Sequence, residues 1–111
     1  MLFRSEQLAA GRPSATAVLW SEQIVELHPT GPSTYTVAWQ WKVWDHLIQD
    51  ATPGIATYGV VADHPERIDL NYGPAASPVD WIHMNSIDYS PERDEIVVSS
   101  RSWSELWVID H

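Results

Sequence analysis

Two regions of the chain alternate apolar and polar residues with a period of two. In the first, a short apolar run over 24–27 is followed by the turn-forming residues HPTGPS and by an alternating run over 35–43. This order predicts a β-hairpin. Alternate residues of its second strand share one face. That face, which we expect to pack in a core, carries large apolar side chains: Tyr35, Val37, Trp39, Trp41 and Val43.

The second region predicts a β-meander. Strand-like segments over 81–89, 95–101 and 105–110 are separated by the turn residues SPERD (Ser90–Asp94) and by a short polar stretch. Residues 1–19, at the other end of the chain, show no clear helical or strand period, and we expect them to form a lead-in segment.

The stretch from Asp45 to Asp80 shows neither period. Proline and glycine interrupt it repeatedly, which predicts a long insertion with a short helix over 64–68. Structureless loops of this length are uncommon in compact domains and are usually functional.

The two strand regions contain similar sequences. WSEQIVELH begins at Trp20 and WSELWVIDH begins at Trp103, each with Trp-Ser-Glu before an apolar strand that ends in histidine. Repetition of a four-stranded antiparallel unit is how β-propellers are built. The predicted fold is all-β, with the outer hairpin of one blade at 20–44, an insertion at 45–80 and the first three strands of the next blade at 81–111. Chance similarity within another all-β protein is the alternative.

Composition adds a large aromatic core and a strong negative charge. The chain has seven tryptophans, four of them between Trp20 and Trp44, and such rings stabilise a fold only when many neighbours cover them, as in a larger protein. Six basic against fifteen acidic residues give a net charge of −9, which argues against nucleic acid and an anionic membrane surface as partners.

Cysteine is absent, so the chain has neither a disulfide framework nor a thiolate metal site. No segment has the pattern of a signal peptide or of a membrane span, which needs about eighteen apolar residues. The compartment, periplasm or cytoplasm, therefore stays open.

Three polar side chains in the second region give the strongest chemical signal. His83 and Asn85 lie two positions apart in DWIHMNSIDY, so on a strand they project to the same side. If Ser90–Asp94 is a five-residue loop, Asn85 faces Ser99 and His83 faces Arg101. Imidazole, carboxamide and guanidinium groups together suit a tetrahedral oxyanion. A four-residue loop would break this arrangement.

A structural role is the main alternative for these residues. Histidine and asparagine on a strand often satisfy neighbouring backbone groups. Arg101 ends the uncharged run VVSS, where a cation is costly unless it meets an anion. An internal ion pair with Asp80 or Asp88 would meet that need without any ligand.

The segments WQWKVWDHLIQD, DWIHMNSIDYSPERDEIVVSSR and ELWVIDH resemble the arylsulfotransferase family, whose pattern is Asp/Asn-Trp-x-His-x-Asn-Ser, a tyrosine, an acidic turn and Ser-Ser-Arg. The similarity runs from about Trp20 to the last residue. It implies a six-bladed propeller that transfers a sulfuryl group from an aryl sulfate ester to a phenol through a sulfohistidine, without a cofactor or a nucleotide sulfate donor. It also implies that His83, Asn85 and Arg101 are the catalytic residues that bind the sulfuryl oxygens.

The chain departs from the family at two histidines. The family's nucleophilic histidine lies well downstream of Ser-Ser-Arg, and another sulfuryl-binding histidine lies well upstream of the tryptophan-rich strand. Neither has a counterpart here. The resemblance therefore implies a fragment that lacks the remaining blades and is inactive alone. His83 as the nucleophile is an alternative that the family pattern does not favour.

Two further classes of function fit other residues. Asp45, His46, His64 and Asp80 include the oxygen and nitrogen ligands of a divalent metal site in a hydrolase, although local hydrogen bonds at a strand end and a turn explain them as well. A noncatalytic propeller that serves as an interaction scaffold would leave the three oxyanion residues with structural roles.

Overall fold

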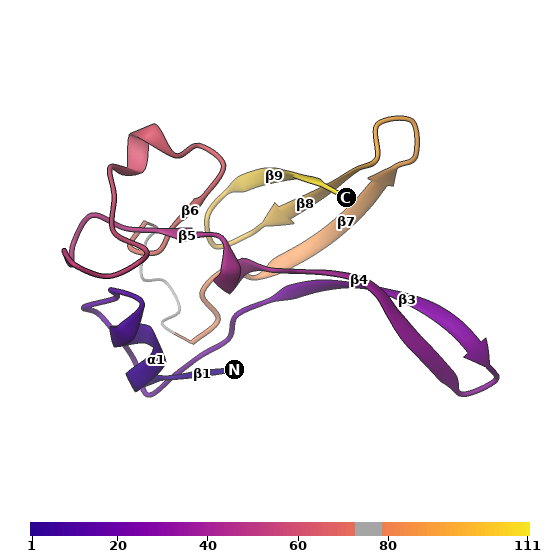
Figure 1. Ribbon diagram of the computed structural model, residues 1–111, viewed down its shortest axis with the longest axis horizontal. Coiled ribbons are helices and arrows are strands. Elements are labelled where there is room, and N and C mark those ends of the chain that lie inside the picture. The colour runs from indigo at the N-terminus through magenta and orange to yellow at the C-terminus, as the bar shows by residue number, and fades with distance from the viewer. Residues whose placement is uncertain (73–78) are drawn as a thin grey trace.

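The computed structural model describes residues 1–72 and 79–111, and strands predominate in it (Figure 1). The strands are β1 (Leu2–Phe3), β2 (Val18–Leu19), β3 (Gln23–Gly31), β4 (Thr34–Lys42), β5 (Leu47–Ile48), β6 (Ile68–Asp69), β7 (Met84–Ser90), β8 (Glu95–Ser100) and β9 (Glu105–Asp110). The helix α1 spans Arg4–Ala9, and the 3-10 turns η1 and η2 span Val43–Asp45 and Val61–Asp63. The predicted all-β class is confirmed. In the described ranges, no helix has the length and apolar character needed to cross a membrane.

Strands β3 and β4 form the predicted antiparallel hairpin. Ile24 pairs with Trp41 and Glu26 with Trp39, and a register shift follows. The predicted core face is correct from Trp39 to Val43, because Val43 is fully buried and Trp39 and Trp41 pack against a core cluster. It is wrong toward the turn, where Tyr35 and Val37 are 61% and 54% exposed. The tip of the hairpin extends away from the other elements (Figure 1), so no described element covers it.

Strands β7, β8 and β9 form the predicted meander, with β8 in the middle. Ser90 pairs with Glu95, so the connecting loop has four residues, and the prediction of a five-residue loop is wrong. β7 also begins at Met84 rather than at Trp81. It begins late because His83 has a left-handed φ of 53°, which regular strand pairing does not allow.

The open end of the hairpin packs against the meander through one apolar cluster. Ile24 of β3 is buried together with Ile96 and Val98 of β8 and Ile109 of β9. Around them pack half-buried side chains: Trp39, Trp41, Met84 and Trp107. Burial of each aliphatic side chain stabilises the fold by roughly 1.5–3 kcal/mol. This cluster therefore fixes the hairpin against the meander.

The predicted insertion contains short regular elements. β5 and β6 pair in parallel, with Leu47 opposite Ile68, and η2 lies before the predicted helix at 64–68. The position of that helix is therefore corrected to Val61–Asp63, and Ile68 belongs to a strand. Residues 73–78 of the insertion lie outside the described residues. The strands escaped prediction because each is two residues long, too short to show a period.

The lead-in segment is folded onto the insertion. Thr57 Oγ1 donates a hydrogen bond to the Ala10 carbonyl at 2.8 Å, and Asn71 Nδ2 donates to the Gly11 carbonyl at 3.1 Å. Gly11 has a φ of 89°, and a Cβ there would lie 2.7 Å from Cδ of the Gln49 side chain, so glycine is required. These contacts tie the two segments together.

A second apolar cluster joins these segments to the residues just before β7. Its buried members come from both sides of the chain's midpoint: Leu19, Val43, Leu47, Ile68, Leu70, Trp81, Ile82 and Trp103. Trp81 and Trp103 meet edge to face with 5.4 Å between ring centroids. Trp81 and Ile82, which directly precede the predicted site residue His83, are therefore anchored in a core.

Candidate oxyanion-binding site

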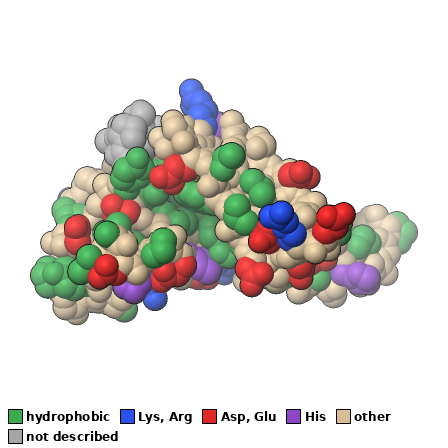
Figure 2. Space-filling model, turned by 90° about the horizontal axis from the view of Figure 1, so that it is seen from above, with side chains coloured by type: hydrophobic (Ala, Val, Ile, Leu, Met, Phe, Trp, Pro, Cys, Tyr) green, Lys and Arg blue, Asp and Glu red, His purple; other side chains and the backbone are tan. Residues whose placement is uncertain are grey.

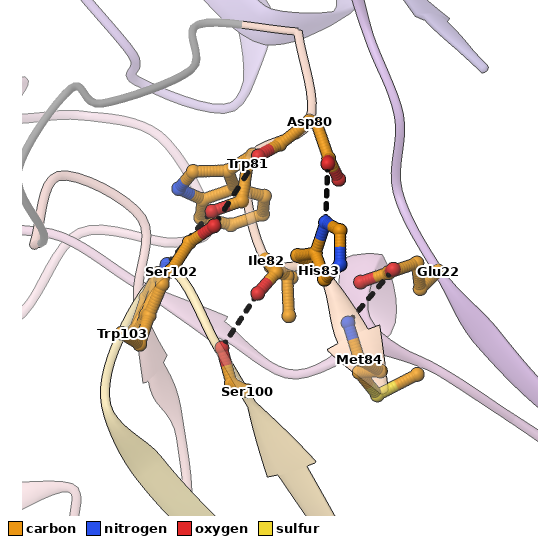
Figure 3. Close-up of polar contacts among 9 residues, drawn as sticks. All are labelled: Glu22, Asp80, Trp81, Ile82, His83, Met84, Ser100, Ser102 and Trp103. Carbon is orange, nitrogen blue, oxygen red and sulfur yellow. Dashed lines mark hydrogen bonds and ion pairs between the residues drawn. The ribbon is translucent and has the colours of Figure 1, made fainter. Parts of the chain in front are cut away.

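The segment Asp80–His83 is held by the end of β8 and the residues that follow it. Ser100 Oγ, which is buried, donates a hydrogen bond to the Ile82 carbonyl at 2.8 Å (Figure 3). Trp103 Nε1 donates to the Trp81 carbonyl at 3.2 Å. These side-chain bonds add to the backbone bonds that Arg101 and Ser102 donate to His83 and Ile82, and the backbone of this irregular segment is fixed.

Both the backbone carbonyl and the ring of His83 form hydrogen bonds. Arg101 N–H donates to the carbonyl at 3.0 Å, and ring Nδ1 lies 2.5 Å from Asp80 Oδ2 (Figure 3). The carboxylate favours a proton on Nδ1. Among the described residues Nε2 has no hydrogen-bond partner, and the side chain is 38% exposed, so a ligand can reach it. Nε2 accepts a hydrogen bond in the neutral ring and donates one in the imidazolium.

Asn85 is the extra residue of a β-bulge. Met84 pairs with Ser100 and Ser86 pairs with Ser99, so Asn85 has no partner across the ladder. Ser99 Oγ donates to Asn85 Oδ1 at 2.5 Å. Because this bond occupies the oxygen, the carboxamide presents Nδ2 as a donor that no described residue uses.

Arg101 directly follows β8, and its side chain is exposed. In the described part of the chain, its guanidinium group has no ion-pair partner. Asp80 contacts His83 instead, and Asp88 Oδ1 accepts the Tyr89 N–H at 3.0 Å. The internal ion pair with either aspartate is therefore not formed, and the guanidinium is open to an external anion.

The predicted register is correct at His83 and Arg101, but for another reason. The four-residue loop shifts the ladder by one position, and the bulge at Asn85 shifts it back, so His83 faces Arg101 after all. The prediction that His83 and Asn85 alternate on one strand is wrong, because His83 precedes β7. The structure pairs the backbones of His83 and Arg101, while the Asn85 side chain contacts Ser99.

Glu22 is a site residue that the sequence analysis missed. It precedes β3, and its Oε1 accepts the Met84 N–H at 2.9 Å, while Oε2 is buried without a partner among the described residues. Burial raises the pKa of Glu22 and the Asp80 charge adds to this, whereas the Met84 bond and the His83 charge oppose it. The available signal was the repeated Trp-Ser-Glu, which places an acid directly before β3 and at the first residue of β9.

Comparison with known proteins decides the family. The family model described as arylsulfotransferase (ASST) matches residues 1–111. The chain belongs to the arylsulfotransferase family. The match includes the lead-in segment, to which the sequence motifs did not extend. Searches of curated proteins and of solved structures found no match.

The arylsulfotransferase chain does not bring together the residues of the alternative metal site. His46 stacks on Trp41 with 4.9 Å between ring centroids, and His64 Nδ1 lies 3.0 Å from Glu66 Oε1. Within the described ranges, no three His, Asp or Glu side chains are grouped to hold a metal ion. The hydrolase alternative based on Asp45, His46, His64 and Asp80 therefore lacks structural support.

An open groove of about 440 Å³ lies beside Asn85, between residues 22–25 and 84–87. Glu22 and Asn85 contribute polar groups to its wall, and Ile24, Met84 and Val98 contribute apolar ones. The groove thus combines an apolar surface with the carboxamide of Asn85, whose Oδ1 accepts the Ser99 hydrogen bond.

Proposed function

We propose that this chain supplies part of the sulfuryl-binding site of an enzyme that transfers a sulfuryl group from an aryl sulfate ester to a phenol. The observation that carries the proposal is the state of three side chains. Asp80 occupies Nδ1 of His83 and Ser99 occupies Oδ1 of Asn85. His83 Nε2, Asn85 Nδ2 and the Arg101 guanidinium are then left without partners among the described residues. When His83 is an imidazolium, all three groups are donors, and such donors suit the three oxygens of a sulfuryl group.

The chemistry of the transfer agrees with these donors. Negative charge develops on the sulfuryl oxygens and on the departing phenolate, and donors fixed in advance stabilise that charge without reorganisation. Arg101 offers paired N–H groups to two oxygens, and a protonated His83 can donate its proton to the leaving oxygen. By analogy with phosphoryl transfer, positioning and charge stabilisation carry most of the catalysis.

The groove beside Asn85 supports an aryl group as the rest of the ligand. Its apolar wall is formed in part by Ile24, Met84 and Val98. Aromatic rings bind to such surfaces mainly through the area that they remove from water. A sulfate ester whose sulfuryl group lies at Asn85 would place its ring along this wall.

The packing of the hairpin on the meander supports a propeller for the parent enzyme. Neighbouring blades of a propeller pack face to face around a central axis, and the β3–β4 hairpin packs on the β7–β9 meander through a shared apolar cluster. We propose that residues 20–44 are the outer hairpin of one blade and residues 81–111 the first three strands of the next.

We further propose that the chain binds the sulfuryl group but does not transfer it. The histidines other than His83 are unsuited to attack at this site: His46 stacks on Trp41, His64 contacts Glu66, and His111 contacts Asp94. His28 lies in β3, where the hairpin extends away from the site (Figure 1). A nucleophile from another part of the enzyme is then required, as the family pattern implies.

The test uses the purified chain with inorganic sulfate, 4-nitrophenyl sulfate and a phenol acceptor. Titration followed by NMR should show saturable shifts at His83, Asn85 and Arg101, and no nitrophenolate should be released. Robust formation of the sulfated phenol would disprove the proposal that the nucleophile comes from another part of the enzyme. Absence of saturable shifts at these residues would favour the noncatalytic scaffold instead.

A further inference from the structure

His83 has a backbone conformation that non-glycine residues rarely adopt. Its φ of 53° lies in the left-handed region. Such a conformation persists only where the surrounding structure over-determines it, and it is often found at functional sites. The contacts that hold His83 in this conformation are therefore of functional interest.

Hydrogen bonds fix the backbone on both sides of His83. On the preceding side, the Ile82 carbonyl accepts Ser100 Oγ–H at 2.8 Å and Ser102 N–H at 3.2 Å. On the following side, Met84 N–H donates to Glu22 Oε1 at 2.9 Å. The bonds to Ile82 come from the end of β8, whereas Glu22 lies 62 positions before Met84 in the sequence.

Glu22 is itself firmly placed. Its backbone carbonyl accepts the Val43 N–H at 3.2 Å, and the Val43 side chain is fully buried. The next residue, Gln23, begins β3 and pairs with Lys42. The Glu22 carboxylate is therefore attached to the open end of the β3–β4 ladder, opposite the turn, and its position depends on how the hairpin packs on the meander.

We propose that Glu22 is a positioning residue for His83. By accepting the Met84 N–H, its carboxylate keeps His83 in the conformation in which the ring reaches Asp80 and the carbonyl faces Arg101 N–H. The β3–β4 hairpin thereby sets the orientation of the imidazole. The inference rests on the proposed function for the identity of the anion, while the geometry of His83 is independent of any ligand.

Glu22 acts through this bond rather than by contact with the ligand. Its Oε2 is buried and has no partner among the described residues, and Figure 3 shows the His83 ring between the Asp80 and Glu22 carboxyl groups. A negative charge on Glu22 opposes a bound anion. Glu22 therefore positions His83 through the hydrogen bond that it accepts from the Met84 N–H, and its charge is not required.

Two substitutions distinguish the effect of the length of the Glu22 side chain from the effect of its charge. Glu22→Gln keeps the length and the acceptor oxygen but removes the charge, whereas Glu22→Asp keeps the charge and shortens the side chain by one methylene. Glu92→Gln, at an exposed position in the β7–β8 loop, makes the same change of net charge far from Met84 and is the matched control. Asp80→Asn removes the carboxylate that holds the ring.

The measurements use the full chain labelled with 15N. The ring-nitrogen shifts of His83 report its tautomer, hydrogen exchange reports protection of the Met84 amide, and titration with inorganic sulfate gives the affinity. We expect Glu92→Gln to match the wild type, and Glu22→Gln to keep the Met84 amide protected and the His83 tautomer unchanged. Glu22→Asp should expose the Met84 amide and mix the two tautomers. It should also weaken sulfate binding about tenfold, as expected on breaking a hydrogen bond to a charged group. Asp80→Asn should change the tautomer and leave the Met84 amide protected.

Three results would overturn the proposal. They are an unprotected Met84 amide in the wild type, unchanged His83 shifts in a folded Glu22→Asp variant, or a loss in Glu22→Gln as large as in Glu22→Asp. Circular dichroism and urea unfolding establish that each variant folds. If Glu22→Asp does not fold, protection of the Met84 amide in the wild type and in Glu22→Gln still tests the proposal. A wild type that binds no sulfate contradicts the proposed function alone, because the shifts and exchange are read without ligand.

Discussion

Arg101 N–H donates to the His83 carbonyl at 3.0 Å, which sets the residue that bears the guanidinium directly opposite the one that bears the imidazole. The bulge at Asn85 makes this pairing compatible with a four-residue loop. It also takes Asn85 out of the ladder and turns its side chain to Ser99. One extra residue therefore both restores the register and frees a donor.

Arg101→Lys should weaken sulfate binding about tenfold while changing the free energy of unfolding by less than about 0.5 kcal/mol. The side chain is exposed and has no ion-pair partner among the described residues, so the fold loses little. A lysine supplies a point charge in place of a planar pair of donors. Sulfate titration and urea unfolding measure the two effects. Arg93→Lys, in the exposed loop, is the control, and parallel losses of binding and stability would support a structural role for Arg101.

Ser99→Ala should weaken sulfate binding severalfold, because Asn85 then loses the bond that fixes its carboxamide. With Oδ1 unpaired, the amide group can rotate and present its oxygen to the anion. Ser86→Ala is the matched control: Ser86 Oγ lies 2.7 Å from Ser99 Oγ and has no recorded bond to Asn85. NMR titration of the Asn85 side-chain amide follows the change. Equal effects of the two substitutions would argue against the assigned orientation.

The regular strands were predictable because their signal is local. Alternation along 35–43 and 95–101 marks the hairpin and the meander without any knowledge of distant residues. The loop length was misjudged because Ser90 suits a turn as well as a strand end, and only its pairing with Glu95 decides. The pairing of His83 with Arg101 was therefore predicted from two errors that cancel, a longer loop and a ladder without a bulge.

The parts that escaped prediction depend on distant contacts. From the sequence alone, Glu22 is expected to be a surface acid. Its role depends on Met84, which lies 62 positions away in the sequence and donates a hydrogen bond to it. Gln7 is fully buried in α1, and its carboxamide bonds the backbone of Thr16 at 3.1 Å, which stabilises a helix that has no apolar period of its own. Such polar contacts leave no periodic trace in the sequence.

His111 should stabilise the contact between the hairpin and the meander below neutral pH and lose that effect as the pH rises. Its ring nitrogens lie 2.9 Å from Asp94 Oδ1 and 3.1 Å from Glu26 Oε2, and Tyr89 Oη–H donates to the same Asp94 oxygen at 2.8 Å. The bond to Asp94, followed by that to Glu26, raises the pKa of His111 above its ordinary 6.5. Bonds from Tyr89 and His111 lower the pKa of Asp94 below its ordinary 3.8.

The sign of each pKa shift sets the pH window. A raised histidine pKa stabilises the folded state below about pH 6.5, and the gain disappears as the pH rises through the folded-state value. A lowered aspartate pKa stabilises it above about pH 3.8, and the gain disappears below. Urea unfolding of His111→Gln should therefore differ most from the wild type near about pH 5 and least near about pH 8. His28→Gln is the control, and a difference that grows with pH would contradict the assignment.

Arg12→Met should raise the free energy of unfolding by about 1 kcal/mol. Arg12 is 6% exposed, and its Nε and Nη1 are buried without partners among the described residues. Each such donor costs about 1–3 kcal/mol, and the contact with the Trp81 ring, 5.1 Å from the guanidinium carbon to the ring centroid, returns about 2 kcal/mol. Methionine keeps much of the apolar volume. Urea unfolding measures the change, and a destabilised variant would contradict the assignment of Arg12 Nε and Nη1 as donors whose burial costs stability.

The free edge of the meander should make the chain associate as its concentration rises. β9 pairs only with β8 in the described sheet, so its outer edge offers unpaired backbone groups, and Leu106 and Val108 are 72% and 63% exposed on that strand. Figure 2 shows apolar side chains gathered in the hollow of one face, with acidic side chains around them. Apolar area of this kind, together with an open edge, drives contact between copies despite the net charge of −9.

Val108→Lys should reduce this association, because a lysine on an edge strand must keep its charge in water and thereby blocks a close partner. Val60→Lys is the matched control. It removes an equally exposed valine, 61% exposed, and changes the charge by the same amount, but it lies in the insertion. Sedimentation velocity from micromolar to millimolar concentration compares the two. If both variants reduce association equally, the added charge is responsible; if only Val108→Lys does, the contact between copies runs along β9.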